Sequence, residues 1–212
     1  MLNYHHYIQL GTLIIGIICF RKYWPVQYKL ILVLVSISFF VEFYGSYLSY
    51  YPHKQNNWLY NIYVPIQAVL TLFITYKLVQ IAKIKKVIVC LIFIFIIAFI
   101  ITYKYHENFF TLNHYALTIN LICCCIGVGV YFIDTMLNTV QIPLLHQPGF
   151  WFMAGVLLFS ILLICRFAFW NLTLNNKDYS KIRFYLIIAS NTFLYLGCIA
   201  TFICSNKRQY LQ

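Results

Sequence analysis

The sequence predicts an all-α polytopic membrane protein, a single-domain bundle of seven transmembrane helices over 1–212. Its N-terminus is expected outside and its C-terminus inside. Of the 212 residues, 63% are hydrophobic, 20% are aromatic and only 9% are charged, against roughly 25% charged residues in an average soluble domain. The chain therefore has too little polar surface to cover a water-soluble core. Its composition excludes a soluble globular domain, a disordered chain and a nucleic-acid-binding domain.

Seven apolar runs follow one another along the chain, and a helix needs about 20 apolar residues to cross the hydrocarbon core. We expect helices over approximately 4–20, 30–50, 59–79, 87–103, 114–134, 150–170 and 182–204. Residues 1–7 hold no Lys or Arg, whereas a secretory signal peptide begins with a basic region, so we expect the first run to remain as a helix. Short connections predict that consecutive helices are antiparallel neighbours.

The basic residues lie in short groups between the apolar runs, where Lys and Arg usually fix membrane orientation. Nine of them fall on one side of a seven-span plan and five on the other. This bias predicts the orientation given above, although Lys181 and Arg183 fall on the outer side against it. The formal net charge of +11 thus indicates topology in a lipid bilayer. We expect a multi-pass protein of the cell membrane, of the bacterial inner-membrane type, without a nucleic-acid partner.

Glu42 is the first candidate for a functional residue, because it lies near the middle of the second predicted helix. An ionisable group at that depth costs roughly 2.5–3.5 kcal/mol on insertion scales and normally faces the bundle interior. Small and polar residues share its face of the helix at helical spacing and favour close contact with neighbouring helices. They are Ser38, Gly45, Ser46 and Ser49.

Arg166 is the second candidate, in the outer part of the sixth predicted helix. At 1.5 Å per residue, Glu42 and Arg166 lie about 20 and 24 Å above the inner ends of their helices. These similar depths predict that the two pair, directly or through Asn or Tyr groups. The pair is either a packing clamp that fixes helix register or part of a ligand or proton site. Alternatively, Arg166 extends to the outer headgroups, and Trp170 one turn away offers a cation–π contact.

Neutral polar residues on three other helices are further candidates for the same interior cluster. Each is either an interhelical hydrogen-bonding group or a ligand contact. They are Asn61 and Gln67 on the third predicted helix, His114 and Asn120 on the fifth, and Asn191 and Tyr195 on the seventh.

Sequence patterns that indicate metal binding or catalysis are missing from the chain. The six histidines show no H-x-x-x-H spacing and the eight cysteines no C-x-x-C spacing, so we predict no metal site and no cofactor. No G-x-S-x-G, H-E-x-x-H or glycine-rich phosphate loop occurs. Paired-carboxylate chemistry needs two acids, but Asp134 falls at the inner end of the fifth helix, far from Glu42. We assign no catalytic residue and favour a non-catalytic protein over an enzyme.

The layout resembles that of many receptors and of the membrane input regions of bacterial sensor proteins, in layout only. We therefore favour a sensory or ligand-binding protein. About eight residues follow the seventh helix, so we expect it to act through a separate membrane or cytoplasmic partner chain. The alternatives are an accessory or assembly subunit of a membrane complex, a small transporter or channel, and an enzyme acting on lipid.

The predicted Glu42–Arg166 pair is testable by a double-mutant cycle. Glu42→Ala alone is expected to destabilise the fold by a few kcal/mol, because it leaves a buried charge without its counterion. Adding Arg166→Leu is expected to recover much of that stability, measured by denaturation in lipid nanodiscs. Strictly additive losses in the double mutant would reject the pairing.

Overall fold

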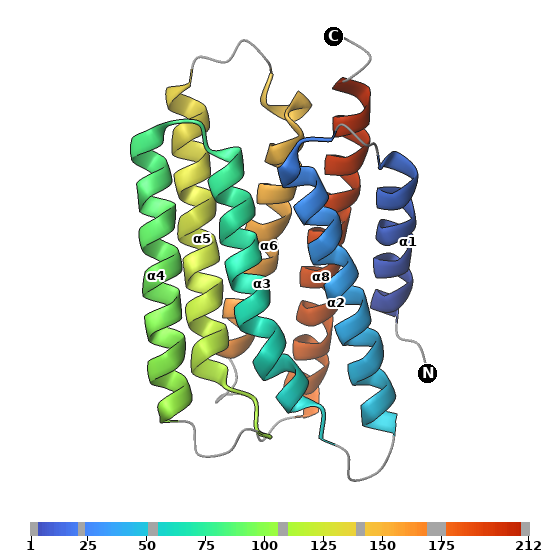
Figure 1. The fold of residues 1–212 in the computed structure, drawn as a ribbon. Helices are drawn as coiled ribbons and strands as arrows, with labels where there is room; N and C mark the ends of the chain where they lie inside the picture. Colours follow the sequence, from blue (N-terminus) through green and yellow to red (C-terminus); the bar gives the residue numbers. More distant parts are fainter. Residues whose placement is uncertain are drawn as a thin grey trace.

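The computed structural model describes residues 4–20, 24–50, 55–105, 110–138, 143–168 and 177–208, and this part of the chain is all-α, as predicted (Figure 1). Its consecutive α-helices run in alternating directions, and a short 3-10 helix, η1 (Leu144–His146), precedes α6. The α-helices are α1 (Tyr4–Cys19), α2 (Val26–Tyr50), α3 (Asn57–Leu78), α4 (Ala82–Lys104), α5 (His114–Leu137), α6 (Pro148–Ala168) and α8 (Lys177–Arg208).

The apolar runs locate these helices, but several helices extend beyond the run that predicts them. α2 begins at Val26 rather than residue 30, and α4 begins at Ala82 rather than residue 87. α8 covers 177–208 rather than 182–204. The added turns of α4 and α8 carry Lys and Arg, which are good helix formers. Hydropathy marks the part of a helix that suits lipid, whereas the backbone hydrogen bonds continue into the charged turns on either side.

Six helices, α2 to α6 and α8, are long and apolar enough to cross a membrane. The apolar part of α1, His6–Cys19, is shorter. Large apolar side chains face outward, most clearly on α4, where Phe93, Ile97 and Ile100 are all more than half exposed. Such a surface is stable in a lipid bilayer, because the lipid acyl chains around it are as apolar as the exposed side chains. The architecture is that of a helical multi-pass membrane protein.

Five of the described helices, α2, α3, α5, α6 and α8, are packed in a ring, each against its neighbours. α4 packs outside the ring against α3 and α5, and α1 packs outside it against α2 and α8. Figure 1 shows α4 and α1 at opposite edges of the bundle. We call the end of the bundle where α2 and α4 end and α3 and α5 begin the cavity end; it is the lower end in Figure 1.

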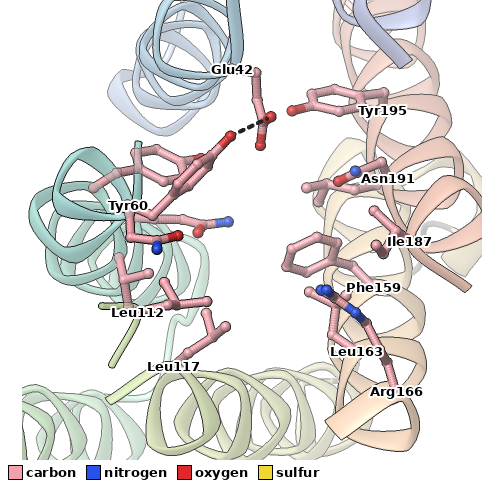
Figure 2. Close-up of a pocket in the computed structure, with 15 residues that line it drawn as sticks. Glu42, Tyr60, Leu112, Leu117, Phe159, Leu163, Arg166, Ile187, Asn191 and Tyr195 are labelled. Atoms are coloured by element: carbon pink, nitrogen blue, oxygen red, sulfur yellow. Dashed lines mark hydrogen bonds between the residues drawn. The ribbon is translucent and has the colours of Figure 1, made fainter. Parts of the chain in front are cut away.

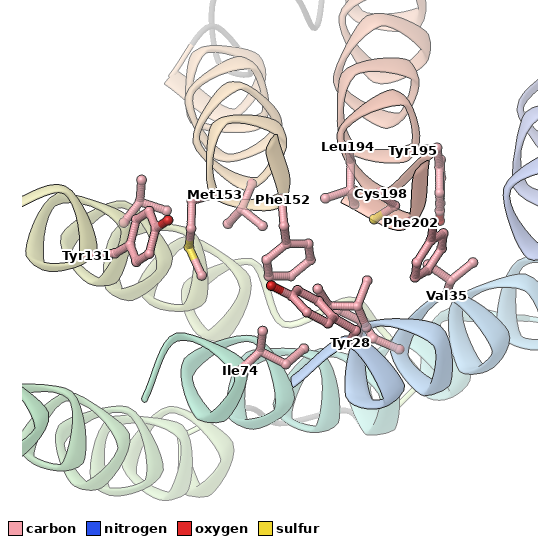
Figure 3. Close-up of a cluster of buried hydrophobic side chains, with 14 of the residues drawn as sticks. Tyr28, Val35, Ile74, Tyr131, Phe152, Met153, Leu194, Tyr195, Cys198 and Phe202 are labelled. Atoms are coloured by element: carbon pink, nitrogen blue, oxygen red, sulfur yellow. The ribbon is translucent and has the colours of Figure 1, made fainter. Parts of the chain in front are cut away.

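The centre of the ring is filled by apolar side chains from all five of its helices (Figure 3). Phe152 and Met153 of α6 and Phe202 of α8 have no exposed surface, and Ile74 of α3 is equally buried. Burial of this kind is the usual means by which helices of a bundle fix their relative positions. This cluster lies between the cavity end and the opposite end of the bundle.

Asp134 fixes the turn between α3 and α4 at the opposite end. Its two carboxylate oxygens accept hydrogen bonds from the backbone N–H groups of Gln80 and Ile81, each at 2.9 Å. Asn138 donates a further bond to Oδ2 at 3.2 Å. A carboxylate in this position caps the start of α4 and opposes the positive end of its dipole. Asp134 therefore has a structural role, at the other end of the bundle from Glu42.

α6 and α8 approach each other most closely at Gly155 and Gly197. A methyl group at Gly197 would lie 2.6 Å from the carbonyl oxygen of Trp151 and 3.0 Å from the Cα of Gly155. Both are backbone atoms, which cannot move aside without shifting a helix. Small residues at such a crossing allow backbone-to-backbone contact, as is common in membrane helix packing.

We expect Gly197→Ala to lower the free energy of unfolding by about 1–3 kcal/mol, because the added methyl group forces the two helices apart. The matched control is Gly129→Ala on α5, where a Cβ meets no atom within 4 Å. That control is expected to be neutral or to stabilise by up to about 1 kcal/mol through helix propensity. Denaturation in nanodiscs measures both. Equal effects of the two substitutions would contradict a tight crossing.

Candidate functional site

A cavity of about 300 Å³ lies inside the ring at the cavity end (Figure 2). All five helices of the ring contribute side chains to it, and so does Leu112, just before α5. The other lining residues are Glu42, Asn57, Tyr60, Tyr63, Val64, Gln67, Leu117, Phe159, Leu163, Arg166, Ile187, Asn191, Leu194 and Tyr195.

The cavity reaches from the end of the bundle toward its middle. Asn57 is the first residue of α3, and Gln67 lies ten residues further along the same helix, which is about 15 Å at 1.5 Å per residue. The floor is formed by Leu194 and Tyr195, which also belong to the central apolar cluster. The lining is mostly apolar with a few polar groups, and the volume falls at the small end of the range of ligand sites.

Glu42 lies on the α2 wall of the cavity and is partly buried. The Tyr60 hydroxyl of α3 donates a hydrogen bond to Glu42 Oε2 at 3.0 Å. Figure 2 shows the hydroxyl group of Tyr195 directed toward the same carboxylate from α8. Gly45, one turn further along α2, allows the contact between Tyr60 and Glu42, because a Cβ atom at this position would lie only 2.9 Å from the Tyr60 hydroxyl oxygen. A side chain there would displace the tyrosine.

The tyrosines around Glu42 are themselves held by buried polar groups. Gln9 of α1, which is fully buried, donates from Nε2 to the Tyr195 hydroxyl at 2.8 Å. The Ser38 and Tyr63 hydroxyls are hydrogen-bonded at 2.5 Å. These two bonds hold the hydroxyl groups of Tyr195 and Tyr63 in place, and a buried polar group left without a partner would be costly.

His6 connects α1 to the same part of α2. Its Nε2 lies 3.0 Å from the Ser46 hydroxyl and 3.3 Å from the backbone carbonyl oxygen of Glu42. His6 and Gln9 are thus two residues through which α1 makes polar contacts with helices that line the cavity. The polar stripe on α2 therefore faces two neighbours, α3 through Ser38 and Gly45 and α1 through Ser46.

Arg166 lies in the last turn of α6, on the opposite wall from Glu42. Figure 2 shows its guanidinium group directed into the cavity, next to Phe159 and Leu163 and away from Glu42. Its Cζ lies 5.3 Å from the centroid of the Phe167 ring, a cation–π distance. Trp170, the expected aromatic neighbour, lies outside the described residues. Direct pairing of Glu42 with Arg166 stays a prediction, and the two side chains line one cavity.

The structure brings five of the eight sequence-predicted site residues to the cavity: Glu42, Gln67, Arg166, Asn191 and Tyr195.

Three predicted residues lie elsewhere. Asn61 is buried but holds the chain before α5, donating to the Thr111 carbonyl at 2.8 Å and accepting from the Asn113 backbone N–H at 2.9 Å. Asn120 lines a separate small cavity further into the bundle and accepts a bond from the Cys124 thiol at 3.3 Å. His114 is exposed, with its ring edge-on to Phe167.

Sequence reasoning missed Tyr60, Tyr63 and Gln9 as site residues. Tyrosine is commonly found at the membrane interface, so Tyr60 and Tyr63 do not stand out in the sequence as site residues. The spacing of Tyr60, Tyr63 and Gln67 on one helical face is a signal that could have found them. Gln9 is the one amide in the first apolar run. Like Glu42, it is a polar residue in an apolar helix and is therefore expected to face the bundle interior.

Comparison of the chain with protein-family models, with curated proteins and with solved structures finds no match. The site must therefore be interpreted from its own chemistry. Its described polar lining consists of one carboxylate, one guanidinium, three amides and three phenols. These groups donate and accept hydrogen bonds and carry opposite charges. Such a set is suited to holding a ligand.

Tyr60→Phe is expected to lower the free energy of unfolding by about 1.5–3 kcal/mol, because it removes a hydrogen bond to a charged group at a partly buried site. Tyr44→Phe is the matched control, since Tyr44 lies on α2 and is 45% exposed. Chemical denaturation in nanodiscs compares the two with wild type. Equal stability of both variants would show that the Tyr60 hydroxyl contributes nothing.

Proposed function

We propose that this chain is a non-catalytic sensory or ligand-binding membrane protein with seven spans, and that it acts through a separate partner chain. The cavity with Glu42 and Arg166 on opposite walls is the observation that supports the proposal most directly. A site for a small molecule is concave, mostly apolar and equipped with a few oriented polar groups. The cavity has all three properties.

The cavity also weighs against the closest alternative, an accessory subunit held together by a Glu42–Arg166 clamp. A purely structural clamp would favour close packing of the two side chains, because buried charges are stabilised by near partners and not by open volume. Here the two charged residues line a space of about 300 Å³. For a transporter, a polar path toward the opposite end would be expected, but Phe152, Met153 and Phe202 fill the centre of the ring.

The proposed orientation puts the cavity on the outer face of the membrane. In this proposal α1 crosses together with the six longer helices, its N-terminus outside. The basic groups near Lys83 and Lys207 then lie inside, in agreement with the usual bias of Lys and Arg. A ligand would enter from outside, and a membrane or cytoplasmic partner would respond to the occupied state.

The proposal is tested by filling the cavity. Leu117→Trp on α5 places a large ring at a cavity-lining position, whereas Ile122→Trp on the same helix lies on an exposed face. Full-length protein of each kind is purified from its expression host into lipid nanodiscs and analysed by native mass spectrometry. We expect wild type and Ile122→Trp to retain a small molecule that Leu117→Trp has lost, because the ring occupies its space.

The same mass spectra detect a partner, as a second protein chain present at fixed stoichiometry. A partner that binds both tryptophan variants equally, with no small molecule in any preparation, would favour the accessory-subunit alternative. Retention of the same small molecule by Leu117→Trp would place its binding outside the cavity and contradict the proposal.

A further inference from the structure

We propose that the cavity binds a zwitterion whose ammonium and acidic groups lie at opposite ends of an apolar chain, of the ω-amino acid type. The inference rests on the proposed function and names its ligand class. Among the described lining residues, the charged side chains are Glu42 and Arg166. A ligand with one positive and one negative group is complementary to both, while a ligand with a single charge is complementary to only one of them.

The Glu42 wall is suited to an ammonium group. A primary ammonium has three N–H donors and no acceptor, and this wall offers a carboxylate beside phenol oxygens. Tyr60 uses its own proton on Glu42, and the Tyr195 oxygen accepts from Gln9. Each phenol oxygen still has a lone pair that can accept from a cation. The ring of Tyr60 adds an electron-rich surface close by.

The Arg166 wall is suited to a carboxylate. The guanidinium group has five donors in a planar fork, and that fork binds a carboxylate through two parallel hydrogen bonds. Its Cζ lies 5.3 Å from the centroid of the Phe167 ring, and a cation–π contact of this kind uses the face of the guanidinium group and not its N–H donors.

The space between the two charged walls is apolar. Figure 2 shows Phe159 and Ile187 between Glu42 and Arg166, with the Asn191 amide at mid-height. An α-amino acid carries both charges on one carbon, whereas the cavity has apolar side chains between its two charged residues. A chain of methylene groups between the charges meets the apolar lining and spans the gap. The volume of about 300 Å³ suits a metabolite-sized chain rather than a whole lipid.

The experiment measures binding by calorimetry to the full chain in nanodiscs, after exchange to remove any retained molecule. The probes are glycine, 4-aminobutanoate, 6-aminohexanoate and 8-aminooctanoate, with hexylamine and hexanoate as singly charged analogues. We expect one of the longer zwitterions to bind at least about tenfold more tightly than glycine and than either analogue, because each charged hydrogen-bonded contact contributes that much or more.

Charge-removing variants give a signature that a merely structural role would not produce. Glu42→Gln is expected to shift the preference from the zwitterion toward hexanoate, and Arg166→Gln to shift it toward hexylamine. Lys104→Gln is the matched control, because Lys104 is exposed on α4 outside the ring. It is expected to change no affinity. If Glu42→Gln fails to fold, Tyr60→Phe serves instead, with weakened binding of the zwitterion and of hexylamine and unchanged binding of hexanoate.

The experiments distinguish a wrong ligand class from a wrong proposed function. If the cavity retains a neutral or singly charged molecule that Leu117→Trp expels, and the zwitterions do not bind, the ligand class is wrong and the proposed function stands. If no probe binds and native mass spectrometry finds no cavity-dependent molecule, both are wrong. Equal affinity for glycine and the longer zwitterions would also overturn the separated-charge inference.

Discussion

Placing a carboxylate inside a membrane-spanning helix is the constraint on which the cavity end depends. Glu42 must be offered hydrogen bonds within the bundle, because lipid offers none. Tyr60 supplies one from α3, and the absence of a side chain at Gly45 lets that ring come close. Tyr195 approaches from α8 and is held in turn by Gln9 of α1. One charge thus determines how four helices are rotated about their axes, and it leaves a polar wall beside an otherwise apolar space.

The central apolar cluster gives the cavity a closed floor, and α8 contributes to both. Asn191 lies in the cavity wall, Leu194 and Tyr195 form its floor, and Cys198 and Phe202 continue the same helix through the core. α6 has the same arrangement, with Arg166 in the wall and Phe152 in the core. The same two helices therefore connect the cavity wall to the apolar cluster at the centre of the described ring and continue to the opposite end of the bundle.

How far the sequence predicts this structure depends on what each pattern encodes. Runs of about 20 apolar residues locate helices because length and hydropathy are local properties. Glu42 and Arg166 are identifiable as site residues because an ionisable group within a membrane helix is costly and normally faces the bundle interior. Rotation about a helix axis is not local, since successive residues point about 100° apart. His114 therefore turns outward while Leu117 of the same helix lines the cavity. Asn61 could not be placed either, because its partners belong to the segment before α5.

The contact of Gly155 with Gly197 has a consequence for motion. At Gly155 and Gly197 no side chain stands between the two backbones, and separating the helices there would open a void. Sliding of packed helices is the shear type of movement. Near the opposite end the Thr201 hydroxyl donates to the carbonyl oxygen of Pro148 at 3.0 Å, where α6 begins. A shear of α6 against α8 would stretch this hydrogen bond. Displacement of either helix along its axis at the cavity would therefore be felt at the Thr201–Pro148 contact, at the opposite end of the bundle.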